Sequence, residues 1–121
     1  MVDQIKDREE IMEVVKKYTD GCKNGDSNLM REAFTDNALM YGYLNDDYFN
    51  GSIDALYGAV DAFGADENTQ VCVDIINVEG TIASVQVTLE NWHGLKFIDY
   101  HSLIKEDGKW RIIAKVFHQY E

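Results

Sequence analysis

Hydrophobic positions in the first part of the chain recur every three or four residues. Between Asp3 and Asn24 the stripe consists of Ile5, Met12, Val15, Thr19 and Cys22, with Ile11 and Tyr18 beside it. This spacing predicts an amphipathic helix with one buried face. The pattern stops at Asn24-Gly25, where glycine can take the left-handed conformation that closes many helices.

A short second helix is expected directly after this break. Asp26 or Ser27 would cap it, and its apolar positions are Leu29, Met30, Ala33 and Phe34, before Asp36-Asn37 interrupts the pattern. Residues 38–44 then predict a first strand, which Asn45-Asp46-Asp47 turns toward Tyr48-Phe49. A third helix follows, with Ser52 as its cap, Ile53, Leu56, Tyr57, Val60 and Phe63 on one face, and Gly64 past its end.

From Thr69 onward the hydrophobic period changes from 3.6 to 2. Val71, Val73 and Ile75 alternate with more polar residues, and so do Ala83, Val85, Val87 and Leu89. Glu79-Gly80, His93-Gly94 and Asp107-Gly108 divide the region into four strands joined as hairpins. Helices followed by an antiparallel meander predict an α+β fold with the helices packed on one face of the sheet.

Composition and charge narrow the class of protein. The chain has 121 residues, so we expect one domain, residues 1–121. The 11 Lys and Arg are outnumbered by 22 Asp and Glu, which gives a net charge of −11 and makes nucleic acid and anionic membranes poor partners. The charged start does not resemble a signal peptide, and the spacing of Cys22 and Cys72 indicates neither a disulfide framework nor a zinc site. We therefore expect a cytoplasmic protein with reduced thiols, no metal and no cofactor.

One strand carries candidate chemistry. Leu95, Phe97, Asp99, His101 and Leu103 share one face of the predicted strand 95–104. If that face points into the protein, a carboxyl group and an imidazole lie two residues apart among apolar side chains. Burial would raise the pKa of Asp99 and lower the pKa of His101 unless the two groups pair and offset each other. Acid–base catalysis uses such groups, and a structural hydrogen-bond network remains the alternative.

The last predicted strand contains a possible partner for Asp99 on one face and part of an apolar surface on the other. Lys115 shares one parity with Phe117, and it could reach Asp99 across the hairpin at Asp107-Gly108 as a structural or catalytic ion pair. The opposite parity holds Trp110, Ile112, Ala114 and Val116, which with Ile98, Tyr100 and Ile104 form an apolar outer patch that no predicted helix covers. Such a patch predicts a two-fold homodimer through the back of the sheet.

Motifs along the whole chain resemble the nuclear transport factor 2-like (NTF2-like) superfamily. They are Gly25-Asp26 followed by Phe34-Thr35-Asp36-Asn37-Ala38, then Phe97-x-Asp99-Tyr100-x-x-Leu103, and finally Asp107-Gly108-x-Trp110-Arg111-Ile112 with Lys115 and Phe117. The later motifs are most similar to the SnoaL-like or putative lumazine-binding subgroup. The resemblance implies a cone in which three helices pack on a strongly curved, mostly antiparallel sheet around a pocket. Superfamily members include isomerases, dehydratases, cyclases and proteins without catalysis, so fold alone does not assign an activity.

The resemblance to ketosteroid isomerase implies roles for two residues. Tyr18 and Asp99 fall where that enzyme has a tyrosine and an aspartic acid that donate hydrogen bonds to a developing enolate. The general base of that enzyme falls at Gly42, which cannot abstract a proton. Steroid-type isomerisation would then require Asp46, Asp54 or His101 as a replacement base.

Two functions remain open at this level. The first is a pocket for a small apolar or aromatic metabolite, with Asp99, His101 and Tyr18 as catalytic candidates for isomerase, dehydratase or cyclase chemistry. Its candidate ligand-binding residues are Met40, Tyr57, Phe63, Phe97, Lys115 and Phe117, and the further aromatic residues Tyr41, Tyr43 and Trp92 either line the pocket or pack. The second is a non-catalytic protein-interaction or dimerisation module of the same fold.

Overall fold

The computed structural model describes residues 4–120 and has the predicted α+β architecture. Two α-helices and a six-stranded sheet make up most of these residues, and two single-turn 3₁₀ segments link α1 to the sheet. The elements in chain order are α1 (Gln4–Asn24), η1 (Ser27–Leu29), η2 (Arg31–Ala33), β1 (Phe34–Leu44), β2 (Asp47–Ser52), α2 (Asp54–Phe63), β3 (Gln70–Glu79), β4 (Ile82–Trp92), β5 (Leu95–Glu106) and β6 (Lys109–Tyr120).

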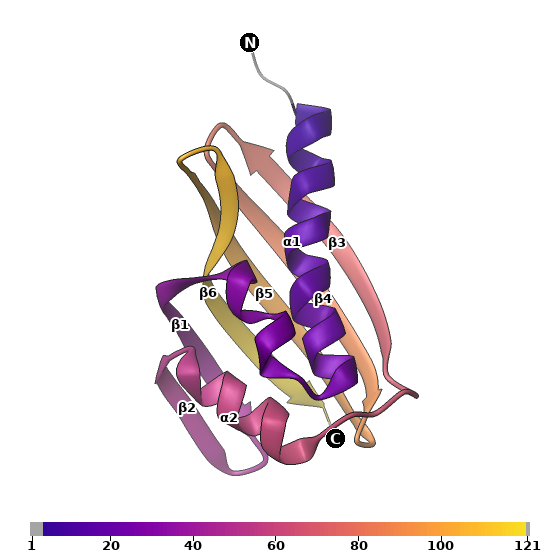
Figure 1. The fold of residues 1–121 in the computed structure, drawn as a ribbon. Coiled ribbons are helices and arrows are strands. Elements are labelled where there is room, and N and C mark those ends of the chain that lie inside the picture. Colours follow the sequence, from indigo (N-terminus) through magenta and orange to yellow (C-terminus); the bar gives the residue numbers. More distant parts are fainter. Residues whose placement is uncertain (1–3, 121) are drawn as a thin grey trace.

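The sheet is curved, and both helices lie on its concave side (Figure 1). The strand order is β2-β1-β6-β5-β4-β3. All neighbouring strands are antiparallel except β1 and β6, which run parallel, so the predicted meander from β3 to β6 is confirmed. α1 crosses the middle of the sheet, whereas α2 lies beside β2 at one end (Figure 1). No helix within residues 4–120 is long and apolar enough to cross a membrane.

The predicted end of the first helix is confirmed at Gly25. This residue has a φ of +62°, and a Cβ there would overlap the backbone carbon of Gly64, so only glycine fits. Asp26 then accepts a hydrogen bond from the Asn28 backbone N–H, as a capping residue does.

The expected second helix is shorter than its apolar spacing predicts. It consists of the two 3₁₀ turns, and Phe34 is the first residue of β1 instead of the last helical residue. Phe34 is extended because it pairs with Ile112 of β6, a contact between distant parts of the chain that local spacing does not report. The described residues therefore contain the first and third predicted helices as α-helices, but not the second.

A bulge in β6 changes which side chains face the helices. Ser102 of β5 pairs with Ala114 and Leu103 pairs with Ile112, so Ile113 is an extra residue in β6. As a result, Trp110 and Ile112 on one side of the bulge and Lys115 on the other are all buried on the concave side. The prediction that Trp110 and Ile112 belong to the outer patch is wrong, because it assumed an unbroken alternation along the strand.

Trp110 instead forms a hydrogen bond that links β6 to α1. Its indole Nε1 donates a hydrogen bond of 3.0 Å to Asp7 Oδ1, and Lys105 Nζ donates another of 3.0 Å to the same oxygen. Both donors favour the charged form of the carboxylate, so the pKa of Asp7 lies below its usual value. These hydrogen bonds join the start of α1 to β5 and β6, and further along the same helix Tyr18 contacts Asp99 of β5.

Candidate active site

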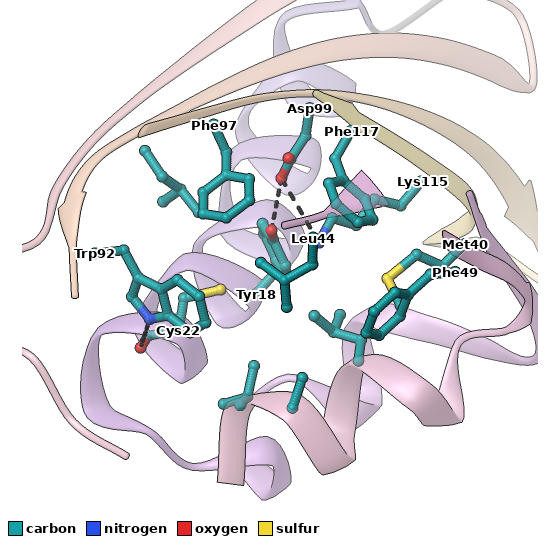
Figure 2. Close-up of a pocket in the computed structure, with 14 residues that line it drawn as sticks. Tyr18, Cys22, Met40, Leu44, Phe49, Trp92, Phe97, Asp99, Lys115 and Phe117 are labelled. Atoms are coloured by element: carbon teal, nitrogen blue, oxygen red, sulfur yellow. Dashed lines mark hydrogen bonds and ion pairs between the residues drawn. The ribbon is translucent and has the colours of Figure 1, made fainter. Parts of the chain in front are cut away.

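A pocket opens between the concave face of the sheet, α1 and α2 (Figure 2). Its cavity volume is about 40 Å³, and the space between the lining atoms, mouth included, is about 430 Å³. One water needs roughly 10–15 Å³ of cavity, so the pocket in this conformation has room for a few small groups. Its lining residues are Tyr18, Cys22, Met40, Leu44, Phe49, Leu56, Ala59, Val60, Leu89, Trp92, Phe97, Asp99, Lys115 and Phe117.

Asp99 is the acidic residue of this lining, and its side chain points inward as the alternation along β5 predicts. Tyr18 on α1 donates a hydrogen bond of 2.5 Å from its hydroxyl to Asp99 Oδ2. His101 Nε2 lies 3.4 Å and Lys115 Nζ 4.0 Å from the same oxygen. The other oxygen, Oδ1, is buried and has no hydrogen-bond partner among residues 4–120. One carboxylate oxygen is thus held by three neighbours, and the other has no hydrogen-bond partner among the described residues.

The charge of Asp99 follows from these contacts. Burial raises the pKa of its carboxyl group, but the Lys115 ammonium and the hydrogen bonds from His101 and Tyr18 together outweigh burial, so the pKa lies below its usual value. Asp99 is therefore a carboxylate at neutral pH. The enolate-donor role that the resemblance implies needs a protonated acid, whereas here the hydroxyl of Tyr18 donates to Asp99 itself.

His101 lies behind Asp99, outside the pocket lining. Since Asp99 is ionised, Nε2 of His101 carries the proton that it shares with the carboxylate, and Nδ1 is a bare acceptor. Nδ1 is buried without a hydrogen-bond partner in the described part of the chain. Burial lowers the pKa of His101 more than Asp99 raises it, because a second proton on Nδ1 would be a buried charge with no acceptor. The imidazole is neutral at pH 7 and orients the carboxylate.

Lys115 places a cation against an otherwise apolar wall. Its side chain is buried, and Nζ lies 4.9 Å from the ring centre of Tyr18 and 5.0 Å from that of Phe117. Within residues 4–120 the ammonium has this aromatic cradle and the 4.0 Å ion pair with Asp99, but no hydrogen bond. Its N–H groups therefore have no hydrogen-bond acceptor among these residues, and Figure 2 shows the dashed line that joins Nζ to Asp99.

Tyr18 and Cys22, one helical turn apart on α1, are neutral. Burial and the nearby carboxylate raise the pKa of Tyr18 well above its usual value. Burial raises the pKa of the Cys22 thiol to about 12, so it is not a thiolate at neutral pH and makes a poor nucleophile.

The structure explains the glycine at position 42. A Cβ built on Gly42 would lie 2.5 Å from Cδ1 of Phe117, which pairs with it across β1 and β6. The ring of Phe117 fills the place into which a side chain at position 42 would project. Of the suggested replacement bases, Asp46 and Asp54 are exposed and lie outside the pocket lining.

The structure brings together most, but not all, of the residues that the sequence proposed for the site. Met40, Phe97, Lys115 and Phe117 line the pocket with Tyr18 and Asp99. Tyr57 and Phe63 are outside it: Tyr57 packs on Phe34 with Arg31 over its ring, and Phe63 is half-exposed against Trp92 and His93. Of the additional aromatic candidates, Trp92 lines the pocket, whereas Tyr41 and Tyr43 are exposed.

Sequence reasoning did not assign several lining residues to the site. Cys22, Leu44, Phe49, Leu56, Ala59, Val60 and Leu89 belong to this group. Cys22 carried a usable signal, since it follows Tyr18 by four residues on the buried stripe of the helix. Among the described residues, no group of three or more His, Cys, Asp or Glu side chains is arranged to hold a metal ion.

Comparison with known proteins shows the family. Residues 6–118 match the family described as "Putative lumazine-binding". The chain belongs to this family. It is also 30% identical over 104 residues to the aldolase FrzH of Cladobotryum sp., with 85% of this chain and 83% of that protein covered.

Solved structures place this family member in the NTF2-like superfamily, as the motifs predicted. An NTF2-like protein of unknown function from Methylobacillus flagellatus KT is 37% identical, with a TM-score of 0.92 over 97% of this chain and 94% of the other. A second, from Shewanella baltica OS155, is 27% identical, with a TM-score of 0.93 over 100% and 99%. A ketosteroid isomerase-like protein from Erwinia carotovora atroseptica SCRI1043 shares 16% identity and a TM-score of 0.69 over 93% and 95%, a likeness of fold.

Proposed function

We propose that the protein binds a small, neutral, largely apolar or aromatic carbonyl compound in this pocket, and that Asp99 acts as a general base toward it. The observation that carries the proposal is the buried carboxylate of Asp99 in the lining of an apolar pocket, whose Oδ1 has no donor within residues 4–120. Such an atom can accept a proton from the carbon next to a carbonyl group. No cofactor is needed for this step.

The charges of the site favour a neutral ligand. Asp99 and Lys115 form an ion pair within the lining, and the other lining side chains are apolar or, like Tyr18, uncharged. A ligand with a net charge would leave an uncompensated charge in the pocket, which is costly in a desolvated site. The aromatic rings of Phe97, Phe117 and Trp92 suit a flat or apolar ligand.

Lys115 compensates for the weakness of Asp99 as a base. A carboxylate whose pKa is lowered removes a carbon-bound proton only if the negative charge that develops on the carbonyl oxygen is stabilised. The free N–H groups of Lys115 can donate to that oxygen in a site with little water, where such donors are most effective. Tyr18 and His101 hold Asp99 in place as positioning residues.

The relatives are consistent with this chemistry. One is named an aldolase and another ketosteroid isomerase-like, and both names denote reactions of carbonyl compounds. Proton removal beside a carbonyl group is a common first step for isomerases, some dehydratases, cyclases and aldolases. We therefore propose the step that these reactions share, which is removal of a proton next to a carbonyl group, and not one complete reaction.

Exchange of carbon-bound hydrogen for deuterium tests this step without knowledge of the natural substrate. Small ketones and aldehydes, such as cyclopentanone and phenylacetaldehyde, would be incubated with the protein in deuterated buffer and followed by NMR. We expect exchange above the buffer rate, and a loss of about 10²–10⁴-fold in Asp99→Asn, the usual contribution of a general base.

Asp7→Asn is the matched control, because Asp7 is also a buried, hydrogen-bonded carboxylate but lies outside the pocket lining. Melting temperatures would establish that each variant is folded. If compounds bind to the wild-type protein without exchange, or if Asp99→Asn exchanges as fast as the wild type, the catalytic proposal is wrong and a non-catalytic binding module remains.

We also propose a homodimer through the outer, convex face of the sheet. Tyr41, Val116 and Tyr100 lie side by side across β1, β6 and β5, and all three are exposed. Gln86 continues the same row on β4, so these four neighbouring positions carry no charge in a chain whose net charge is −11, and the first charge along the row is Asp74 on β3. Two copies can therefore meet here without like-charge repulsion at the contact.

A further inference from the structure

Lys115 is a buried lysine of the pocket lining whose ammonium lacks a hydrogen bond within the described residues. Its side chain is buried at 5% relative exposure, yet Nζ forms no hydrogen bond to residues 4–120. A buried ammonium kept only for stability normally has its N–H groups paired. Lys105 illustrates the contrast, since its Nζ donates to Asp7 at 3.0 Å and it lies outside the pocket lining.

The ion-pair partner of Nζ and the two aromatic rings beside it all belong to the pocket lining. Tyr18 and Phe117 present their rings to Nζ at about 5 Å, and Asp99 Oδ2 lies 4.0 Å away. All four residues line the same pocket (Figure 2). A carbonyl carbon bound there lies within reach of the nitrogen, and a carboxylate beside it can take up the proton of the amine.

From this placement we infer that Lys115 forms an iminium (Schiff base) with aldehydes or unhindered ketones that bind in the pocket. The inference rests on the proposed function and deepens it, because it replaces a hydrogen bond to the carbonyl oxygen by a covalent bond to the carbonyl carbon. The substrate class is accordingly a small aldehyde or ketone, and esters, amides and free acids are excluded. Lys115 is then a catalytic residue, because its nitrogen bonds covalently to the substrate.

The step balances with the groups at the site. The Lys115 ammonium gives one proton to the Asp99 carboxylate, and the resulting amine attacks the carbonyl carbon to form a carbinolamine. The Asp99 carboxylic acid then returns its proton to the carbinolamine hydroxyl, which leaves as water while the carbon–nitrogen double bond forms. One ammonium and one carbonyl compound have become one iminium and one water, and Asp99 is again a carboxylate. The iminium is a stronger electron sink than the carbonyl, which lets a weakly basic carboxylate remove the neighbouring proton.

Reductive trapping tests the inference directly. The wild-type protein would be treated with propanal and sodium cyanoborohydride at pH 7, and the modified lysines identified by peptide mass mapping at early times. We expect Lys115 to be alkylated at least about tenfold faster than the exposed Lys16, the difference that about 1.4 kcal/mol in activation free energy produces. Equal or slower alkylation of Lys115 overturns the inference.

Two variants sharpen the readout. Lys115→Arg keeps the positive charge but cannot form an iminium, so the fast-labelled site should disappear while the melting temperature stays close to that of the wild type. Lys105→Arg is the matched control at a lysine that also pairs with a carboxylate, and labelling of Lys115 should be unchanged. If either variant fails to fold, the relative alkylation rates of Lys115 and Lys16 in the wild-type protein decide the test.

Deuterium exchange separates failure of the inference from failure of the proposed function. If propanal exchanges its α-hydrogens in an Asp99-dependent reaction but Lys115 is not labelled preferentially, and Lys115→Arg retains exchange, the general-base proposal holds and the iminium is wrong. If Lys115 is labelled rapidly and no exchange occurs, the iminium inference is supported and the proposed base is wrong.

Discussion

At the scale of single residues, His101 couples the site to pH. The imidazole is fully buried, and its neutral form donates from Nε2 to Asp99. Because the folded protein lowers the pKa of His101, the unfolded chain binds more protons than the folded one below the unfolded value of about 6.5. The contribution of His101 to stability is therefore complete above that pH and is lost as the pH falls.

This predicts a stability loss that begins as the pH falls below about 6.5, before the carboxylates titrate. The slope for one proton is at most about 1.4 kcal/mol per pH unit. His101→Gln, whose amide can still donate to Asp99, should flatten this part of the profile. Urea unfolding midpoints from pH 8 to 4 would measure it, and a wild-type profile that is flat down to pH 5 would contradict the assignment.

Below about pH 4 a second decline is expected. The pKa of Asp99 is lowered in the fold, so the stabilisation from its ionised form is present above the unfolded value of about 3.9 and is lost as the pH falls toward the folded value. His101→Gln should retain this second decline, which distinguishes the two groups in one titration.

Gly42 is a second residue whose identity the surroundings determine. Gly42→Ala should cost about 1–3 kcal/mol of unfolding free energy, since the added methyl overlaps the ring of Phe117 and a well-packed region must shift. Gly58→Ala in α2 is the control: a Cβ there meets nothing within 4 Å, and alanine favours a helix by about 0.5–1 kcal/mol. Urea unfolding of the two variants should therefore give opposite signs; a neutral Gly42→Ala would show that Phe117 moves freely.

At the scale of elements, the hydrophobic alternation predicted the inward face of a regular strand correctly and failed in a strand with a bulge. The alternation along β5 correctly placed Asp99 and His101 on the inner face, because this face is regular from Phe97 to Leu103. The same reasoning failed in β6, where the extra residue Ile113 inverts the alternation and brings Trp110 inside together with Lys115. This bulge leaves no signature in the hydrophobic pattern, since the three residues at its centre, Ile112, Ile113 and Ala114, are all apolar.

The attachment of α1 to β6 gives a prediction at this scale. Trp110→Phe keeps an aromatic ring but removes the indole donor to Asp7, leaving this buried carboxylate with Lys105. We expect the melting temperature to fall by several degrees, because a hydrogen bond to an ionised group is stronger than one to a neutral group. Trp92→Phe provides the comparison, as its indole donates to the neutral carbonyl oxygen of Cys22. If calorimetry shows a larger fall in melting temperature for Trp92→Phe than for Trp110→Phe, the prediction is wrong.

At the scale of the whole molecule, the site exists only through contacts between distant segments. Tyr18 and Asp99 are 81 residues apart, and Phe117 fills the space above Gly42 through a parallel pairing. From the sequence, the residue types and the inward face of β5 were predictable, and the family resemblance joined Tyr18 to Asp99. The free oxygen of Asp99, the unbonded ammonium of Lys115 and the size of the pocket depend on how α1, α2 and β6 are packed, which no local pattern encodes.

The outer sheet face yields the last prediction. Tyr100 and Val116, at 53% and 44% relative exposure, are direct neighbours near the centre of this face. If the face joins two copies, Tyr100→Glu and Val116→Glu each place carboxylates close together across a two-fold axis in a protein with a charge of −11, and the dimer should dissociate.

Light scattering coupled to size-exclusion chromatography should give a dimer mass for the wild type at micromolar concentration and a monomer mass for both variants. Met12→Glu is the control, because Met12 is similarly exposed but lies on α1, on the opposite side of the sheet. Its mass should stay that of the dimer. A monomeric wild type would refute the dimer without affecting the chemistry of Asp99, because the pocket lies on the concave side of the sheet. Dissociation by Met12→Glu alone would instead move the interface to the helices.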